Sequence, residues 1–185
     1  MGGDGTWLPR IKDAHYSGRV QIRPAEPEDW PSIWPFLARI VAAGETYCWP
    51  RDTTEQAARQ WWTGKPGGRV YVAVDEGGAD GDLLAGTAEL HPNQPAGGSH
   101  VANAGFMVSP DAAGRGIGRA LARHVIAEAG RLGYRAMQFN AVIETNTHAV
   151  ALWRSLGFEI LATVPEAFDH PTQGLVGLHI MHRTL

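Results

Sequence analysis

The sequence predicts an α/β domain that is built on a mixed β-sheet. In the second half, β-branched and apolar stretches alternate with amphipathic helical stretches, in the order strand, helix, strand, helix, strand. That alternation requires a parallel crossover between strands. In the first half, short strands follow one another across turns, which indicates antiparallel pairing. One sheet that contains both halves is therefore mixed.

The chain divides into a flexible N-terminal arm and a single domain. Residues 1–18 carry glycines and a proline without periodicity, whereas residues 19–185 hold all the patterned segments. Strands are expected at 19–23, 69–75, 83–90, 101–108, 135–142, 158–164 and 175–183. Helices are expected at 26–43, 53–62, 114–132 and 146–156, and residues 91–99 are expected to form a loop.

Two details refine the helical segments of the first half. Pro35 is expected to kink or split the helix at 26–43, because proline removes a helical hydrogen bond. Four tryptophans at helical spacing are expected to lie in the core, and one of them could line a substrate entrance. They are Trp30, Trp34, Trp61 and Trp62.

The composition excludes several classes of protein. The 185 residues carry 16 basic and 19 acidic side chains, so the chain lacks the basic excess typical of nucleic-acid binding. No apolar run reaches the roughly 18–20 residues of a membrane span, and no secretory signal pattern begins the chain. The single Cys48 excludes an intrachain disulfide. We expect a cytoplasmic protein with no membrane contact.

A glycine-rich loop between a strand and a helix is the most informative segment. It reads Val108-Ser-Pro-Asp-Ala-Ala-Gly-Arg-Gly-Ile-Gly-Arg-Ala-Leu121. Glycines at this place let the backbone approach an anion, and the N–H groups of the first helical turn lack partners within the helix. A tight turn with a helix cap would use the same residues.

Two nucleotide-binding motifs fail on spacing. The dinucleotide fingerprint Gly-x-Gly-x-x-Gly, counted from Gly114, requires glycine at the position of Arg119. Counted from Gly116, it requires glycine at Leu121. The Gly-Lys-Ser/Thr of a phosphate-binding P-loop is absent from this loop.

The loop resembles the acetyl-CoA motif of the GNAT N-acetyltransferase superfamily, Gln/Arg-x-x-Gly-x-Gly/Ala. Gly116 and Gly118 match its glycines, whereas Ala113 stands at the first position. A second block, Asn146-Thr-His-Ala-Val-Ala-Leu-Trp153-Arg-Ser-Leu-Gly-Phe158, is similar to the family's Asn-x-x-Ala-x-x-x-Tyr-x-x-x-Gly-Phe. Trp153 replaces the tyrosine that often protonates the leaving thiolate. Its indole N–H donates a hydrogen bond but is not an acid at neutral pH.

The resemblance implies acetyl-CoA as co-substrate and direct attack of an amine on its thioester. It implies a sheet that splays between the strands at 101–108 and 135–142, with the pantetheine in the gap. A backbone N–H at Met107 or Val108 would polarise the thioester carbonyl. The cofactor-binding positions implied in this way are Met107, Val108, Ala113, Gly114, Arg115, Gly116, Ile117, Gly118, Arg119, Asn146 and Trp153. Asn146 would also serve as a helix N-cap.

Two mid-strand asparagines are the candidate catalytic residues. Asn103 and Asn140 lie among apolar neighbours, where an unpartnered amide would cost about 1–3 kcal/mol. Each either bonds a loop or orients the amine substrate. With neighbouring residues they resemble the GNAT branch that contains the yeast acetyltransferase for azetidine-2-carboxylate, in which matching asparagines contact substrate. The resemblance implies a small amine substrate, such as an amino acid or a proline analogue.

Other polar side chains are weaker candidates. Glu89 and Glu144 are reserve candidates for a general base, while His91 and His100 are expected at the surface. His179 and His182 should point to opposite faces of one strand, so no metal site is expected. Cys48 is expected to be a packing residue rather than an acyl carrier.

Three functional classes remain open for this sequence. The leading one is a small-molecule amine N-acetyltransferase, which could be a homodimer. A phosphinothricin-type toxin acetyltransferase is the alternative among enzymes. The missing tyrosine, together with the absence of a carboxylate from residues 101–108, also suits a sensor that binds acyl-CoA without catalysis.

Overall fold

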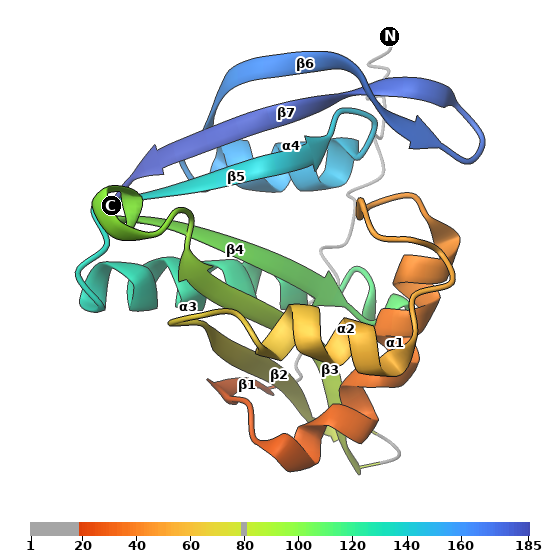
Figure 1. Cartoon of the computed structure of the whole chain (residues 1–185). Coiled ribbons are helices and arrows are strands. Elements are labelled where there is room, and N and C mark those ends of the chain that lie inside the picture. The colour runs from red at the N-terminus through yellow and green to blue at the C-terminus, as the bar shows by residue number, and fades with distance from the viewer. Residues whose placement is uncertain (1–18, 79–80) are drawn as a thin grey trace, which may run out of the picture.

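The structure is a computed structural model that describes residues 19–78 and 81–185. The arm expected at residues 1–18 lies outside the described residues. Figure 1 shows one twisted sheet with helices on both of its faces. The α/β class and the mixed sheet are confirmed.

The expected strands and helices are all present. The strands are β1 Arg19–Pro24, β2 Arg69–Gly78, β3 Gly81–Pro92, β4 Val101–Val108, β5 Ala136–Ile143, β6 Glu159–His170 and β7 Gly174–Thr184. The α-helices are α1 Trp30–Ala43, α2 Glu55–Thr63, α3 Ile117–Arg131 and α4 Thr147–Ser155. Single 3-10 turns lie at η1 Pro27–Asp29, η2 Ala96–Gly98 and η3 Pro110–Ala112.

The sheet order is β1-β2-β3-β4-β5-β7-β6, and its one parallel pair lies at the centre. Strands β1 to β4 pair antiparallel, as do β5, β7 and β6. The parallel strands β4 and β5 pair only at Val101–Ala136 and Ala102–Met137. Beyond these two pairs the strands diverge, which Figure 1 shows as a widening separation. The splayed sheet that the resemblance implied is therefore present.

The two faces of the sheet carry different helices and different cores. Helices α3 and α4 cover one face, where Leu121 and Val125 of α3 pack against the alanines of β3 and β4. Helices α1 and α2 cover the other face, with Ile33, Leu37 and Trp62 at the centre of the core. The splayed centre of the sheet therefore has α3 and α4 on one side and α1 and α2 on the other.

The structure differs from the sequence expectations at several places. Strand β2 ends at Gly78 rather than at residue 75, and β3 spans Gly81–Pro92, so the loop expected at 91–99 begins after Pro92. Helix α1 continues past Pro35 without splitting, and Pro35 is exposed. Strands β6 and β7 run longer than expected, since an irregularity between Val164 and Phe168, with Glu166 at φ 51°, absorbs the proline at 165 without ending the strand. Trp61 is 41% exposed and packs edge-on against Trp49, so the core expectation is wrong for that residue.

Candidate active site

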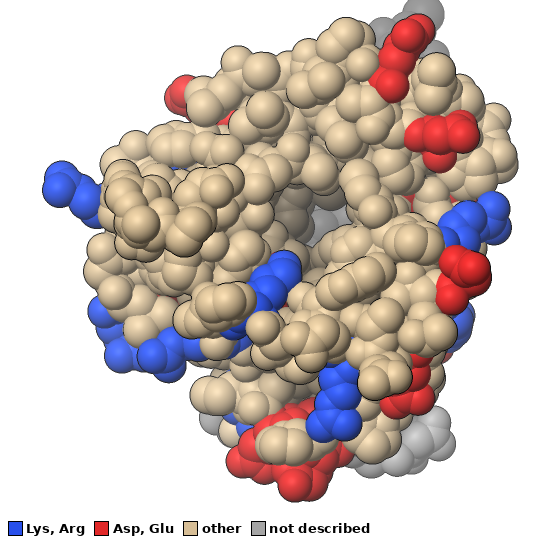
Figure 2. All heavy atoms as spheres, in the orientation of Figure 1, with Lys and Arg blue, Asp and Glu red and all other residues tan. Residues whose placement is uncertain are grey.

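A cavity of about 580 Å³ opens where β4 and β5 diverge. Its walls come from β4, β5, the start of α3, α4 and the segment that joins α1 to α2. In the space-filling view this face of the molecule is hollowed near its centre (Figure 2). The lining includes both candidate catalytic asparagines, Asn103 and Asn140.

The glycine loop forms a tight passage from β4 into α3. Gly114 and Gly116 adopt φ of 77° and 76°, the left-handed region that side chains with a Cβ rarely enter. A Cβ at either position would meet open space, so the backbone angle is what requires glycine there. Gly116 is the N-cap residue of α3, but glycine has no side chain to accept the N–H groups of the first turn, which are therefore uncapped and left for a ligand. This geometry fits the expected diphosphate site.

The arginines and the alanine of this loop have partners within the protein. Arg115 lies 3.0 Å from the carboxylate of Asp75, which is 1% exposed. Arg119 donates to the hydroxyl of Ser155 on α4, at 2.9 Å. The N–H of Ala113 reaches back to the carbonyl of Pro110 at 3.3 Å. The loop is thus tied to both its neighbours in space, β2 and α4.

The alternation of the β3–β4 ladder determines which backbone groups of β4 face the gap. Asn93 N–H donates to Val101 and Ser109 N–H donates to Ala85, so the odd-numbered residues of β4 face β3. Even-numbered residues consequently point their N–H and C=O groups toward β5. Of the two expected thioester donors, this places the N–H of Val108 in the gap and that of Met107 in the β3 ladder.

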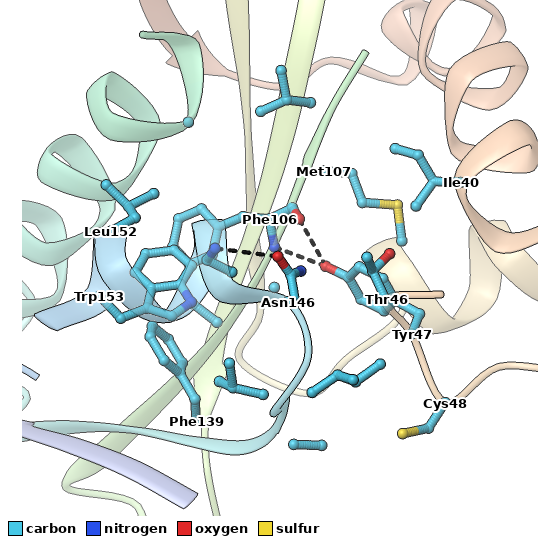
Figure 3. A pocket seen from close by; sticks show the side chains of 18 of the residues that line it. Ile40, Thr46, Tyr47, Cys48, Phe106, Met107, Phe139, Asn146, Leu152 and Trp153 are labelled. Atoms are coloured by element: carbon cyan, nitrogen blue, oxygen red, sulfur yellow. Dashed lines mark hydrogen bonds between the residues drawn. The ribbon is translucent and has the colours of Figure 1, made fainter. Parts of the chain in front are cut away.

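Tyr47, which the sequence reasoning missed, fills part of the same gap. Its hydroxyl accepts the N–H of Phe106 and donates to the carbonyl of Phe106, both at 2.9 Å (Figure 3). Burial is the main cause that raises the pKa of this phenol, followed by the negative charge of Glu89. A tyrosine in a loop between two amphipathic helices is the signal that could have identified it, since a buried phenol needs a hydrogen-bond partner.

The two asparagines have different hydrogen-bond partners. The Asn103 side chain accepts the N–H of Ala104, at 2.8 Å, and so covers another backbone donor that faces the gap. Asn140 is exposed, so the expectation that it lies buried among apolar neighbours is wrong. It donates to the side chain of Asn93 at 2.7 Å and accepts from Gln138 at 2.9 Å. Of the three amides in this chain, Asn140 lines the cavity.

Helix α4 brings Asn146 and Trp153 to the cavity, as the resemblance implied. The Asn146 side chain accepts the N–H of Ala149 at 3.2 Å, which confirms the N-cap (Figure 3). Trp153 is 7% exposed and packs against Phe106 and Phe139, with ring centroids 4.9 and 4.7 Å away. Its indole therefore forms an apolar wall beside the gap.

Of the two reserve carboxylates, Glu89 lines the cavity. Glu89 is 5% exposed and pairs with Lys65 at 2.7 Å, with His91 next to it. Glu144 accepts the N–H of Gly177 on β7 at 3.0 Å. His91 is half-buried beside Glu89 and Lys65, so the expectation that it lies at the surface is wrong. The same expectation is confirmed for His100, which is exposed.

The remaining candidates contribute little chemistry to the cavity. Cys48 is exposed at its rim, and desolvation by neighbouring atoms raises the pKa of the thiol, which disfavours a thiolate nucleophile. His179 is buried against Thr163. Within residues 19–78 and 81–185, no group of three His, Cys, Asp or Glu side chains is placed to hold a metal ion. In the same residues, no helix is long and apolar enough to cross a membrane.

Comparison with known proteins identifies the family. Residues 30–158 match the Acetyltransferase (GNAT) family. The chain belongs to this family, which confirms both the resemblance and the fold and is consistent with acetyl-CoA as the co-substrate.

Individual relatives agree with this assignment. A GCN5-related N-acetyltransferase from Kribbella flavida is 55% identical, with a TM-score of 0.83 over 90% of this chain and 98% of that one. A phosphinothricin acetyltransferase from Sinorhizobium meliloti, solved in complex with AcCoA, is 25% identical, with a TM-score of 0.76 over 90% of this chain and 88% of that one. The N-acetyltransferase aca1 of Schizosaccharomyces pombe is 38% identical over 84 residues, which span 45% of this chain and 40% of that protein.

Proposed function

We propose that the protein transfers the acetyl group of acetyl-CoA directly to an amine of a small molecule. One observation carries this proposal: the uncapped start of α3 and the β4–β5 gap border the same cavity. A ligand with phosphates at one end and a thioester at the other would fit this arrangement. Helix N-termini attract phosphate, and backbone N–H groups in a gap stabilise a developing oxyanion.

The cofactor would lie across the family's motif residues. The diphosphate is assigned to the backbone from Ala113 to Arg119, and the pantetheine to the gap between β4 and β5. Asn146 and Trp153 would border the pantetheine near its thiol end. The N–H of Val108 is the donor proposed for the thioester carbonyl, because the N–H of Phe106 is already bonded to Tyr47.

The chemistry would proceed without an acyl-enzyme. The amine nitrogen attacks the thioester carbonyl carbon, the C–S bond breaks, and the thiolate of CoA leaves. Trp153 offers no ionisable proton, so the thiolate would take a proton from the amine nitrogen or from water. A thiolate is a stable leaving group, and this substitution therefore leaves turnover intact.

The proposed substrate is a small amine such as an amino acid or a proline analogue. The cavity of about 580 Å³ lies within the usual range for small-molecule sites. Asn103 and Asn140 would orient the amine through their amides. A phosphinothricin-type acceptor is the alternative substrate, which the similarity to the Sinorhizobium meliloti enzyme keeps open.

The experiment is an assay of thioester cleavage with a panel of amines that includes azetidine-2-carboxylate, proline and phosphinothricin. Turnover with one of these amines is the expected result. CoA binding without release of free thiol for any amine would instead favour a non-catalytic acyl-CoA sensor. That candidate function is favoured by the tryptophan at the position of the family's tyrosine and by the absence of a carboxylate from residues 101–108. A cytoplasmic location and a homodimer stay predictions.

A further inference from the structure

Glu89 is a buried carboxylate that faces the cavity from the side opposite α3. In the antiparallel β3–β4 ladder Glu89 pairs with Gly105, and paired residues of such a ladder point to the same face. That face is covered by α2, since a Cβ on Gly105 would lie 3.1 Å from Trp62. The diphosphate site lies at the start of α3, on the other face. An amine that approaches the thioester from the face opposite α3 would therefore lie beside Glu89.

We propose that Glu89 is the general base that removes a proton from the incoming amine, a role that rests on the acetyltransferase activity proposed above. The strand that precedes the glycine loop contains no carboxylate, and its Asn103 cannot accept a proton. The base must therefore come from another element. Glu89, on the neighbouring strand β3, is the carboxylate that lines the cavity.

The two oxygens of this carboxylate have unequal surroundings. Oε1 lies 2.7 Å from the ammonium group of Lys65, in an ion pair. Oε2 is buried and, among the described residues, has no hydrogen-bond partner. A buried oxygen that lacks a partner is uncommon and costs free energy unless a ligand or water completes it. Oε2 therefore keeps an unused acceptor, but it is fully buried in this structure, so the carboxylate would have to turn this oxygen toward the cavity to meet an ammonium group of the substrate.

Gly105 makes room for this carboxylate at the edge of the gap. A Cβ at position 105 would lie 2.8 Å from Oε1 of Glu89, so a side chain there would displace the carboxylate from its present position. The negative charge of Glu89 also contributes to the raised pKa of Tyr47, whose hydroxyl is bonded to Phe106 inside the gap. The carboxylate thus acts electrostatically on the place where the thioester would lie.

Lys65 and His91 are positioning residues for this base. Nδ1 of His91 lies 2.7 Å from the carbonyl of Pro92, which can only accept, so Nδ1 carries the proton of the neutral ring. Nε2 is then an acceptor; it lies 3.3 Å from Lys65 and 3.6 Å from Oε2 of Glu89. Once Glu89 is protonated, Nε2 is the nearest acceptor for the proton on its way to solvent.

The protons of the reaction balance with this assignment. A primary ammonium substrate gives one proton to the carboxylate of Glu89, and its freed lone pair attacks the thioester carbonyl carbon. As the C–S bond breaks, the nitrogen loses a second proton, which ends on the sulfur of CoA. The third proton stays on the amide product. Glu89 then returns its proton to solvent, so the net products are the acetylated amine, CoA and one proton.

The test compares Glu89→Gln with wild-type protein, using the amine of the panel that is turned over fastest. Loss of a general base should lower kcat by about 10²- to 10⁴-fold, while the Kd for CoA stays within about twofold of wild type. The residual rate should rise about tenfold per pH unit until the amine itself deprotonates, because the variant needs a neutral amine. Glu144→Gln is the matched control; its carboxylate is bonded to Gly177 outside the cavity lining, and it should keep wild-type kcat.

Lys65→Gln keeps the inference falsifiable if Glu89→Gln unfolds. Removal of the ammonium that holds Oε1 should lower kcat while the KM for acetyl-CoA stays near wild type, and Lys65→Arg, which keeps a cation beside Oε1, should retain most of the kcat. A purely structural role would lower Tm and leave the kcat of the folded protein at the wild-type value. A wild-type kcat in folded Glu89→Gln would overturn this inference and leave the proposed acetyltransferase function standing. Absence of turnover by the wild type with every amine would overturn the proposed function, and this inference with it.

Discussion

Substitution of Gly118 separates CoA binding from folding, because the structure leaves limited space beside that residue. A Cβ at position 118 would lie 3.6 Å from Val108 and 3.8 Å from Leu152, both ordinary van der Waals distances. Gly118 lies in the first turn of α3 and does not have the positive φ of Gly116. Alanine should therefore fit the folded chain without strain.

The expected magnitudes follow from this geometry. Alanine in place of glycine stabilises a helix by roughly 0.5–1 kcal/mol, so Gly118→Ala should raise Tm by about 1–4 °C. Its CoA affinity should stay near wild type, since the family motif accepts alanine at this position. Valine would extend two methyl groups toward Val108 and Leu152, which line the cavity. Gly118→Val should therefore raise the Kd for CoA at least tenfold, about 1.4 kcal/mol.

Calorimetric titration with CoA and thermal unfolding measure the two effects on the same samples. Alanine and valine differ only in the volume that they place beside the gap, so each variant controls for the other. A folded Gly118→Val protein with wild-type affinity for CoA would refute the assignment of the cofactor to this cavity.

Three further predictions concern Trp153, the two asparagines of the cavity and the ion pair between Arg23 and Asp29. Trp153→Ala should lower the free energy of unfolding, measured in urea, by about 3–5 kcal/mol, because the indole is buried. Trp153→Tyr should keep or modestly raise turnover. A pH–rate profile whose basic limb is lost only in Trp153 variants would contradict a purely packing role. Asn103→Ala and Asn140→Ala should each lower kcat/KM by about tenfold to a few hundred-fold at constant CoA affinity; a fall in Tm with unchanged specific activity would show that these amides only hold loops. Hydrogen bonds from Arg23 lower the pKa of Asp29, so their contribution to stability is complete above about pH 4 and is lost as pH falls through the folded-state pKa. The difference in unfolding free energy between wild type and Arg23→Met should therefore shrink below about pH 4. A difference that stays constant with pH would argue against the ion pair.

The parts of the site that depend on local sequence were predictable. The glycine loop and the Asn146 cap each lie within one short segment, where backbone angles and caps follow from residue type. The succession of strands and helices along the second half followed from alternating periodicities, and β4 begins and ends where it was expected. Family membership then gave these local features their place in the fold.

The parts that depend on contacts across the chain were not predictable. Tyr47 bonds Phe106 across 59 positions, and Lys65 pairs with Glu89 across 24. No periodicity in the sequence brings such residues together, because their meeting depends on how α1 and α2 pack against the sheet. Asn140 likewise gave no sign that its partner would be Asn93 on a distant loop.

The most direct measurement for the whole account follows the acetyl group through a single turnover. Protein in excess is mixed with acetyl-CoA, with and without an amine that it turns over, and the protein mass, free CoA and acetylated amine are measured together. We expect free CoA and acetylated amine to appear in equal amounts only when the amine is present, with the protein mass unchanged throughout. An acetyl group retained on the protein, at Cys48 for example, would contradict direct transfer through the β4–β5 gap.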